Sequence, residues 1–247
     1  MPFSPVSEAI VLFSVPALFW HLLIVQLYGR VSIRRVILVQ TFALVWTAGA
    51  YAFVRYQFGV PLLGDIPTVL VPVASLFLAA ALAWAFRYRL LGDGVPQQVL
   101  IAVQLFRPIG LIFVLEDFRG TLPSIFAQPA GWGDLIAGMT ALIVLVRHPR
   151  GRIPTREVVL VAVIGLLDFT SAFFFGATSS DSPLQLFAFG EANRALEYPL
   201  GMIPALLVPY AVACHVLSLA QLRRGSAAAA DDDSAALVKS GGERRWS

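Results

Sequence analysis

Five residues that could do chemistry stand in stretches of this chain that are otherwise almost wholly apolar. They are Arg107, Asp134, Asp168, His21 and His215. A charge at the centre of a lipid bilayer costs about 2.5–3.5 kcal/mol on insertion scales, so intramembrane charges face other helices, pair, and mark ion or substrate pathways. Arginine and aspartate suit ion pairing or anion capture better than acid–base catalysis. We therefore expect a binding role before an enzymatic one.

Arg107 and Asp168 are the first candidates for a buried ion pair. Arg107 lies about nine residues into the fourth apolar run and Asp168 about eleven residues into the sixth, counted from the same side. Similar depth and opposite charge predict that the two side chains pair. Gly165 and Ala172 share a helical face with Asp168, and such small residues let a neighbouring helix approach closely. A structural clamp and a ligand site both remain open.

Asp134 follows the segment Pro129-Ala130-Gly131-Trp132-Gly133, which is typical of a helix start. We expect Asp134 in the first turn of the fifth span, at the outer surface, where a carboxylate caps free amides and meets the positive end of the helix dipole. In this interpretation Asp134 is not a partner of Arg107. A glycine-rich helix start could instead hold an anionic head group. The acidic pair Glu116-Asp117 is interpreted as a solvated helix end.

The histidines offer an alternative chemistry. His21 and His215 fall at similar depth in the first and seventh apolar runs. Two such imidazoles could ligate a b-type haem, although buried histidines more often donate to a carbonyl or to a neighbouring helix. We expect no cofactor and no metal site, with haem at His21 and His215 as the alternative. The single cysteine, Cys214, leaves no intrachain disulfide.

Composition indicates what must position these residues. The chain is 58% hydrophobic and 13% charged, against about 25% charged in soluble domains. Seven apolar runs come near the roughly 20 residues that cross a bilayer. We predict an all-α transmembrane bundle over residues 1–224 and a disordered cytoplasmic tail over 225–247. The runs are approximately Ile10–Tyr28, Val36–Val54, Ile66–Phe86, Gln98–Leu115, Pro129–Val146, Val158–Gly176 and Pro199–Leu222.

Basic residues near the ends of the spans predict the orientation. One side carries eleven arginines, namely Arg30, Arg34, Arg35, Arg87, Arg89, Arg147, Arg150, Arg152, Arg156, Arg223 and Arg224. The other side carries three, Arg55, Arg119 and Arg194. The N-terminus is therefore expected outside and the C-terminus in the cytoplasm. Pro108, next to Arg107, either shapes helix packing or opens the fourth span towards a cavity.

The sequence lacks the residues that several known activities require. No lysine lies in an apolar run, which excludes a retinal Schiff base, and the sequence has no His-Glu-x-x-His, Gly-x-Ser-x-Gly or Walker-type motif. Nothing in the sequence indicates binding of nucleic acid. The partners that we expect are the lipid bilayer and a small solute, a lipid or other membrane subunits.

One long pattern runs from Arg107-x-x-Gly110 through Gly133-Asp134 and Gly165-Leu166-Leu167-Asp168 to His215. This pattern resembles an uncharacterised family of bacterial multi-pass inner-membrane proteins. It covers roughly residues 104–222, and Gln128 departs mildly from it. The resemblance implies a bacterial inner-membrane protein, carries no known activity, and marks Arg107, Asp134, Asp168 and His215 as pattern positions. The motifs are Arg107-x-x-Gly110, Leu122-Pro123-x-x-Phe126-Ala127-x-Pro129-Ala130-Gly131-x-Gly133-Asp134-x-x-x-Gly138, Gly165-Leu166-Leu167-Asp168, Ser182-Pro183-Leu184-Gln185 and Ile203-Pro204-x-x-x-Val208-Pro209 before His215.

Three classes of function follow from these observations. The first is a protein that binds, transports or senses a small solute or lipid through an outward-opening polar pocket at Arg107 and Asp168. The second is a haem protein or intramembrane enzyme that uses His21 and His215. The third is a structural subunit of a membrane complex, which would explain the small-residue helix faces.

Overall fold

The computed structural model describes residues 2–56, 70–90 and 95–223, and this part of the chain is helical with no strand. Seven of its helices are long and apolar enough to cross a membrane. The expected tail over 225–247 and the expected start of the third span at Ile66 lie outside the described residues. The all-helical, seven-span prediction is confirmed at this level.

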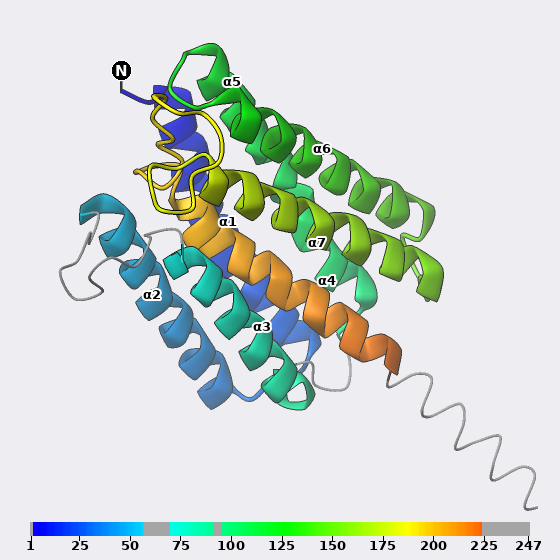
Figure 1. Cartoon of the computed structure of the whole chain (residues 1–247). Coiled ribbons are helices and arrows are strands. Elements are labelled where there is room, and N and C mark those ends of the chain that lie inside the picture. Colours follow the sequence, from blue (N-terminus) through cyan, green and yellow to red (C-terminus); the bar gives the residue numbers. More distant parts are fainter. Residues whose placement is uncertain (1, 57–69, 91–94, 224–247) are drawn as a thin grey trace, which may run out of the picture.

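The helices follow one another along the chain, and the connection from α7 to the last helix is long. The first three spans are α1 (Pro5–Tyr28), α2 (Ile33–Tyr56) and α3 (Leu70–Leu90), and the fifth and sixth are α6 (Ser124–Arg147) and α7 (Thr155–Thr178). The seventh span, Ile203–Arg223, begins with a π-helical turn, η2 (Ile203–Leu207). Figure 1 shows this last helix running between α7 on one side and the pair α2 and α3 on the other.

The fourth span is built from three pieces rather than one regular helix. It consists of α4 (Gln97–Ala102), the 3₁₀ segment η1 (Val103–Gly110) and α5 (Leu111–Phe118). Pro108 lies inside η1, where it supplies no backbone N–H and disfavours regular α-helical hydrogen bonding. Arg107, directly before this proline, therefore projects from the irregular middle of the span.

Helix burial is uneven across the bundle. In α2 only Ala50 and Val54 are buried, whereas α6 buries a continuous face of small residues. Large apolar side chains such as Phe13, Trp20 and Leu38 are two-thirds or more exposed, at 78%, 67% and 69%. Exposure on this scale is disfavoured in water and is expected on a surface that faces lipid. Elements η1, α5, α6 and α7 pack closely together, and Arg107, Asp134 and Asp168 lie on three of them.

Candidate functional site

Arg107 is fully buried, with 0% of its surface exposed, and all its guanidinium nitrogens have partners. Its Nε donates to Asp134 Oδ1 at 2.7 Å and its Nη1 donates to the Gly165 carbonyl at 3.1 Å. Its Nη2 donates to Asp168 Oδ2. The guanidinium also lies over the ring of Phe169, 3.8 Å from its centroid. One cation from η1 thus connects two acids, one on α6 and one on α7.

The expected position of Asp134 is wrong. Helix α6 begins at Ser124, after Pro123, so that Asp134 lies ten residues further along and is 8% exposed. Pro129 is inside α6 rather than at its start, because Pro123 already supplies the fixed φ that precedes a helix. Asp134 is therefore a partner of Arg107 within the bundle and does not cap its own helix at the outer surface. The Arg107–Asp168 contact, by contrast, is present in the structure.

Glycines make room for the carboxylates. A Cβ atom at Gly133 would overlap the carboxyl group of Asp168, and one at Gly110 would overlap that of Asp134. A Cβ at Gly165 would lie 2.5 Å from His215 Nε2 and 2.9 Å from Arg107 Nη1, closer than real Cβ atoms approach. The small residues that the sequence places on these helix faces therefore make room for the charged side chains, in addition to permitting close helix packing.

The cluster contains two acidic side chains and one basic side chain. Asp134 and Asp168 also interact with each other through their side chains, and both lie beside a single guanidinium. Two ionised carboxylates and one cation would leave one net negative charge in a buried site. Such a charge is strongly disfavoured unless it is paired or neutralised, and two carboxyl groups in one site typically share a proton.

A small cavity extends from this cluster towards the loop that follows α7. Its volume is about 60 Å³, and a water molecule needs at least about 10–15 Å³ of such space, so several waters fit. This is far below the roughly 300–1,000 Å³ of pockets that hold larger ligands. Asp134 and Asp168 line one part of the cavity, and Ser180, Asn193 and Leu196 of the loop after α7 line another. Its walls are mostly apolar and include Phe113, Phe126, Phe169 and Phe173.

Sequence comparison places these residues in one family. A family described as a domain of unknown function, DUF8737, matches residues 63–223. The chain belongs to this family. No curated protein and no solved structure matches the chain. The predicted resemblance to an uncharacterised family is thereby confirmed in its general form, and Arg107, Asp134, Asp168 and His215 all lie within the DUF8737 region.

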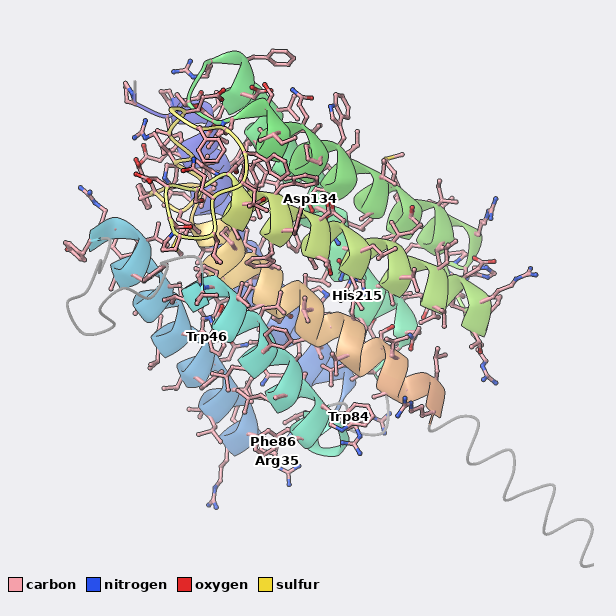
Figure 2. All side chains as sticks on the ribbon, viewed as in Figure 1. Arg35, Trp46, Trp84, Phe86, Asp134 and His215 are labelled. Atoms are coloured by element: carbon pink, nitrogen blue, oxygen red, sulfur yellow. The ribbon has the colours of Figure 1, made fainter. Side chains whose placement is uncertain are left out.

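The two histidines do not form a pair of free ligands for a haem iron, because both ring nitrogens of His21 are already engaged. His21, on α1 and outside the DUF8737 region, has both ring nitrogens engaged, Nδ1 with the Tyr210 hydroxyl at 2.7 Å and Nε2 with the Val99 carbonyl at 2.7 Å. His215 is buried beside Gly165 and Arg107, and its Nε2 has no hydrogen-bond partner among the described residues. Figure 2 shows Asp134 and His215 inside the bundle. This geometry does not favour a bis-histidine haem site, and it adds His215 to the charged cluster.

No group of three or more His, Cys, Asp or Glu side chains in the described part of the chain could hold a metal ion.

Glu116 is buried in the structure, which the sequence did not predict. It is 0% exposed, so its interpretation as a solvated helix end is wrong. Its Oε1 accepts from the Ser4 amide at 2.8 Å and the Ser7 hydroxyl at 2.6 Å, and its Oε2 accepts from the Thr121 hydroxyl at 2.8 Å. The carboxylate of Glu116 thus connects α5, which lies inside the DUF8737 region, to the start of α1. No local pattern could have indicated this, since two of its partners lie more than 100 residues away.

The loop over the cavity is also fixed to the start of α1. Arg194 Nε donates to Glu197 Oε2 at 2.8 Å, and its guanidinium lies 4.7 Å from the ring centroid of Phe3. The hydrogen bond to Glu197 raises the pKa of Arg194. The hydroxyl of Tyr198 donates to Glu8 at 3.3 Å, and burial together with the Glu8 carboxylate raises the pKa of Tyr198. The N-terminal end of α1 therefore holds the loop that lines the cavity.

Proposed function

We propose that this DUF8737 protein is a multi-pass protein of a bacterial inner membrane, with its N-terminus outside and its C-terminus in the cytoplasm. Seven apolar helices, extensive exposed apolar surface and the segregation of arginines to one set of helix ends support this proposal. A reporter fused to either terminus tests the orientation. A periplasmic C-terminus would overturn it.

Within the membrane, the proposed role is binding of a proton, together with water or a small polar solute, at the Arg107–Asp134–Asp168 cluster. The observation that supports this most strongly is the presence of two buried carboxyl groups beside one fully buried guanidinium. A bound proton neutralises the excess negative charge and needs less space than any other cation. Buried acid and histidine groups of this kind form proton relays in membrane pumps and transporters, and such a site suits a protein that senses or couples to the outer solution.

The cavity supplies the route for exchange. Its mostly apolar walls lower the local polarity, which strengthens the electrostatic interactions of the cluster, while Asn193 and Ser180 provide polar groups at the loop. Asn193 Nδ2 donates to the Ser179 hydroxyl at 2.8 Å, so this end of the cavity is ordered by its own hydrogen bonds. A few ordered waters can carry protons between the loop and the carboxyl groups.

Infrared spectroscopy of the purified full chain tests the binding of a proton. The variants Asp168→Asn and Asp134→Asn remove one carboxyl group each from the cluster. The matched control is Asp117→Asn, since Asp117 lies at the outer end of α5 and accepts from Ser124 and Gln128 instead. We expect a band from a protonated carboxyl group in wild type and in Asp117→Asn, and its loss or shift in at least one cluster variant. Identical spectra for all four proteins would overturn the proposal.

A purely structural role is the second candidate, because Arg107 has partners at every nitrogen and the three helices meet through glycine contacts. In that case the cluster only holds η1, α6 and α7 together. The same experiment separates the candidates, since a structural clamp with two ionised carboxylates produces no carboxyl band that depends on Asp134 or Asp168.

A further inference from the structure

A second cavity lies on the other side of the last helix, away from the charged cluster. Its volume is about 530 Å³, within the range of roughly 300–1,000 Å³ typical of ligand pockets. It is bounded by α1, α2, α3 and the last helix, and nearly all of its lining is apolar. An apolar cavity does not hold ordered water well, so a space of this size favours an apolar occupant.

Among the described residues, the amide and charged side chains that line the cavity lie at one end of it, and Trp46, Tyr210 and Cys214 add polar atoms elsewhere. The residues there are Gln26 and Arg35, and no acidic residue in the described part of the chain lines the cavity. Gln26 is 3% exposed, and although its Oε1 accepts from Gln40 Nε2 at 3.0 Å, its own Nε2 has no hydrogen-bond partner in the described part of the chain. A buried amide donor without an acceptor is destabilising. The polar end of the cavity therefore lacks an acceptor.

This polar end is also the basic end of the bundle. Figure 2 shows Arg35, Phe86 and Trp84 together at one end of the molecule. The Trp84 ring has the guanidinium of Arg87 at 4.1 Å and that of Arg223 at 5.2 Å from its centroid. Tryptophan and arginine in this combination are typical of the membrane–water interface, where anionic lipid head groups lie.

The length of the cavity corresponds to one leaflet. Along α2 the lining extends from Arg35 to Trp46, a separation of eleven residues that spans about 16 Å at 1.5 Å per residue. Half of a hydrocarbon core of about 30 Å is about 15 Å. An acyl chain that enters beside Arg35 would therefore end near the middle of the bilayer, beside Trp46 and Leu206.

We propose that this cavity binds one anionic phospholipid, with an acyl chain along its apolar walls. The lipid phosphate pairs with Arg35, and a phosphate or ester oxygen accepts the free hydrogen bond of Gln26 Nε2. In the orientation proposed above, the lipid comes from the cytoplasmic leaflet. A neutral isoprenoid or a helix from a second copy would fill the apolar part but would supply no anion to Arg35.

Native mass spectrometry of the full chain in detergent tests this site, with phosphatidylglycerol and phosphatidylcholine as probes. The variant Arg35→Gln removes the charge at the cavity, and Arg34→Gln is its matched control, because Arg34 is an exposed neighbour that does not line the cavity. A third variant, Ala213→Phe, fills the apolar part, since Ala213 lies on the wall.

We expect wild type and Arg34→Gln to retain one phosphatidylglycerol in preference to phosphatidylcholine. Arg35→Gln should weaken this binding about tenfold, as expected for the loss of one charge-assisted hydrogen bond, and Ala213→Phe should abolish it. Equal retention of the two lipids by wild type, equal binding by Arg35→Gln and Arg34→Gln, or a dimer that carries no lipid would each overturn the proposal. Arg107 and the small cavity play no part in this experiment, so its result is independent of the proposed proton site.

Discussion

Replacing Arg107 with alanine should destabilise the protein more than any change at an exposed arginine. The variant loses the hydrogen bonds to Asp134, Gly165 and Asp168 and leaves two carboxyl groups without their cation. Removing one partner of a buried ion pair costs about 3–5 kcal/mol. For a chain of this length each kcal/mol changes the unfolding temperature by roughly 2–4 °C, so we expect a loss of roughly 6–20 °C.

Thermal unfolding of the purified full chain in detergent measures this loss, and Arg34→Ala is the control. Arg34 is exposed at the start of α2, and surface substitutions usually change stability by less than about 0.5 kcal/mol. The triple variant Arg107→Ala, Asp134→Asn, Asp168→Asn should recover part of the loss, because most of it arises from uncompensated charge. The reasoning is refuted if Arg107→Ala and Arg34→Ala unfold at the same temperature.

Two further substitutions test the packing around the site. Gly133→Ala places a methyl group on the Asp168 carboxyl and should destabilise the fold by about 1–3 kcal/mol through overpacking. The control is Gly49→Ala, which meets nothing within 4 Å and should be neutral or stabilising. Equal unfolding temperatures for the two variants would contradict the close contact. Glu116→Ala should leave the Ser4 amide without its acceptor and raise hydrogen exchange at the start of α1. Unchanged exchange there would show that Glu116 does not hold the N-terminal segment.

The sequence predicted the fold well because membrane spans are encoded locally. Length and hydropathy are properties of a continuous stretch, and a bilayer imposes nearly the same requirement on every span. The helix ends were less accurate. The first span begins at Pro5 rather than Ile10, since Ser4 caps it through a hydrogen bond from the Val6 amide at 3.2 Å, and an N-cap next to polar residues does not alter the hydropathy of the run.

The site was predicted in part, and the missing part depends on contacts distant in sequence. Depth and opposite charge were sufficient to pair Arg107 with Asp168. Asp134 was assigned to the surface because Gly131 and Gly133 resemble a helix start, whereas in α6 they make room for Val114 and Asp168. Glycine that permits close helix contact and glycine that begins a helix look alike in one sequence. Only the fold distinguishes them.

The protonation state of the two buried carboxyl groups tests the central claim most directly. Carbon-13 labelling of aspartate side chains in the full chain, followed by magnetic resonance of the purified protein near neutral pH, reports whether each carboxyl is ionised. We predict one resonance at the position of a neutral carboxylic acid, absent from the spectrum of Asp168→Asn or of Asp134→Asn. A spectrum in which every aspartate is ionised would contradict the proposed proton site.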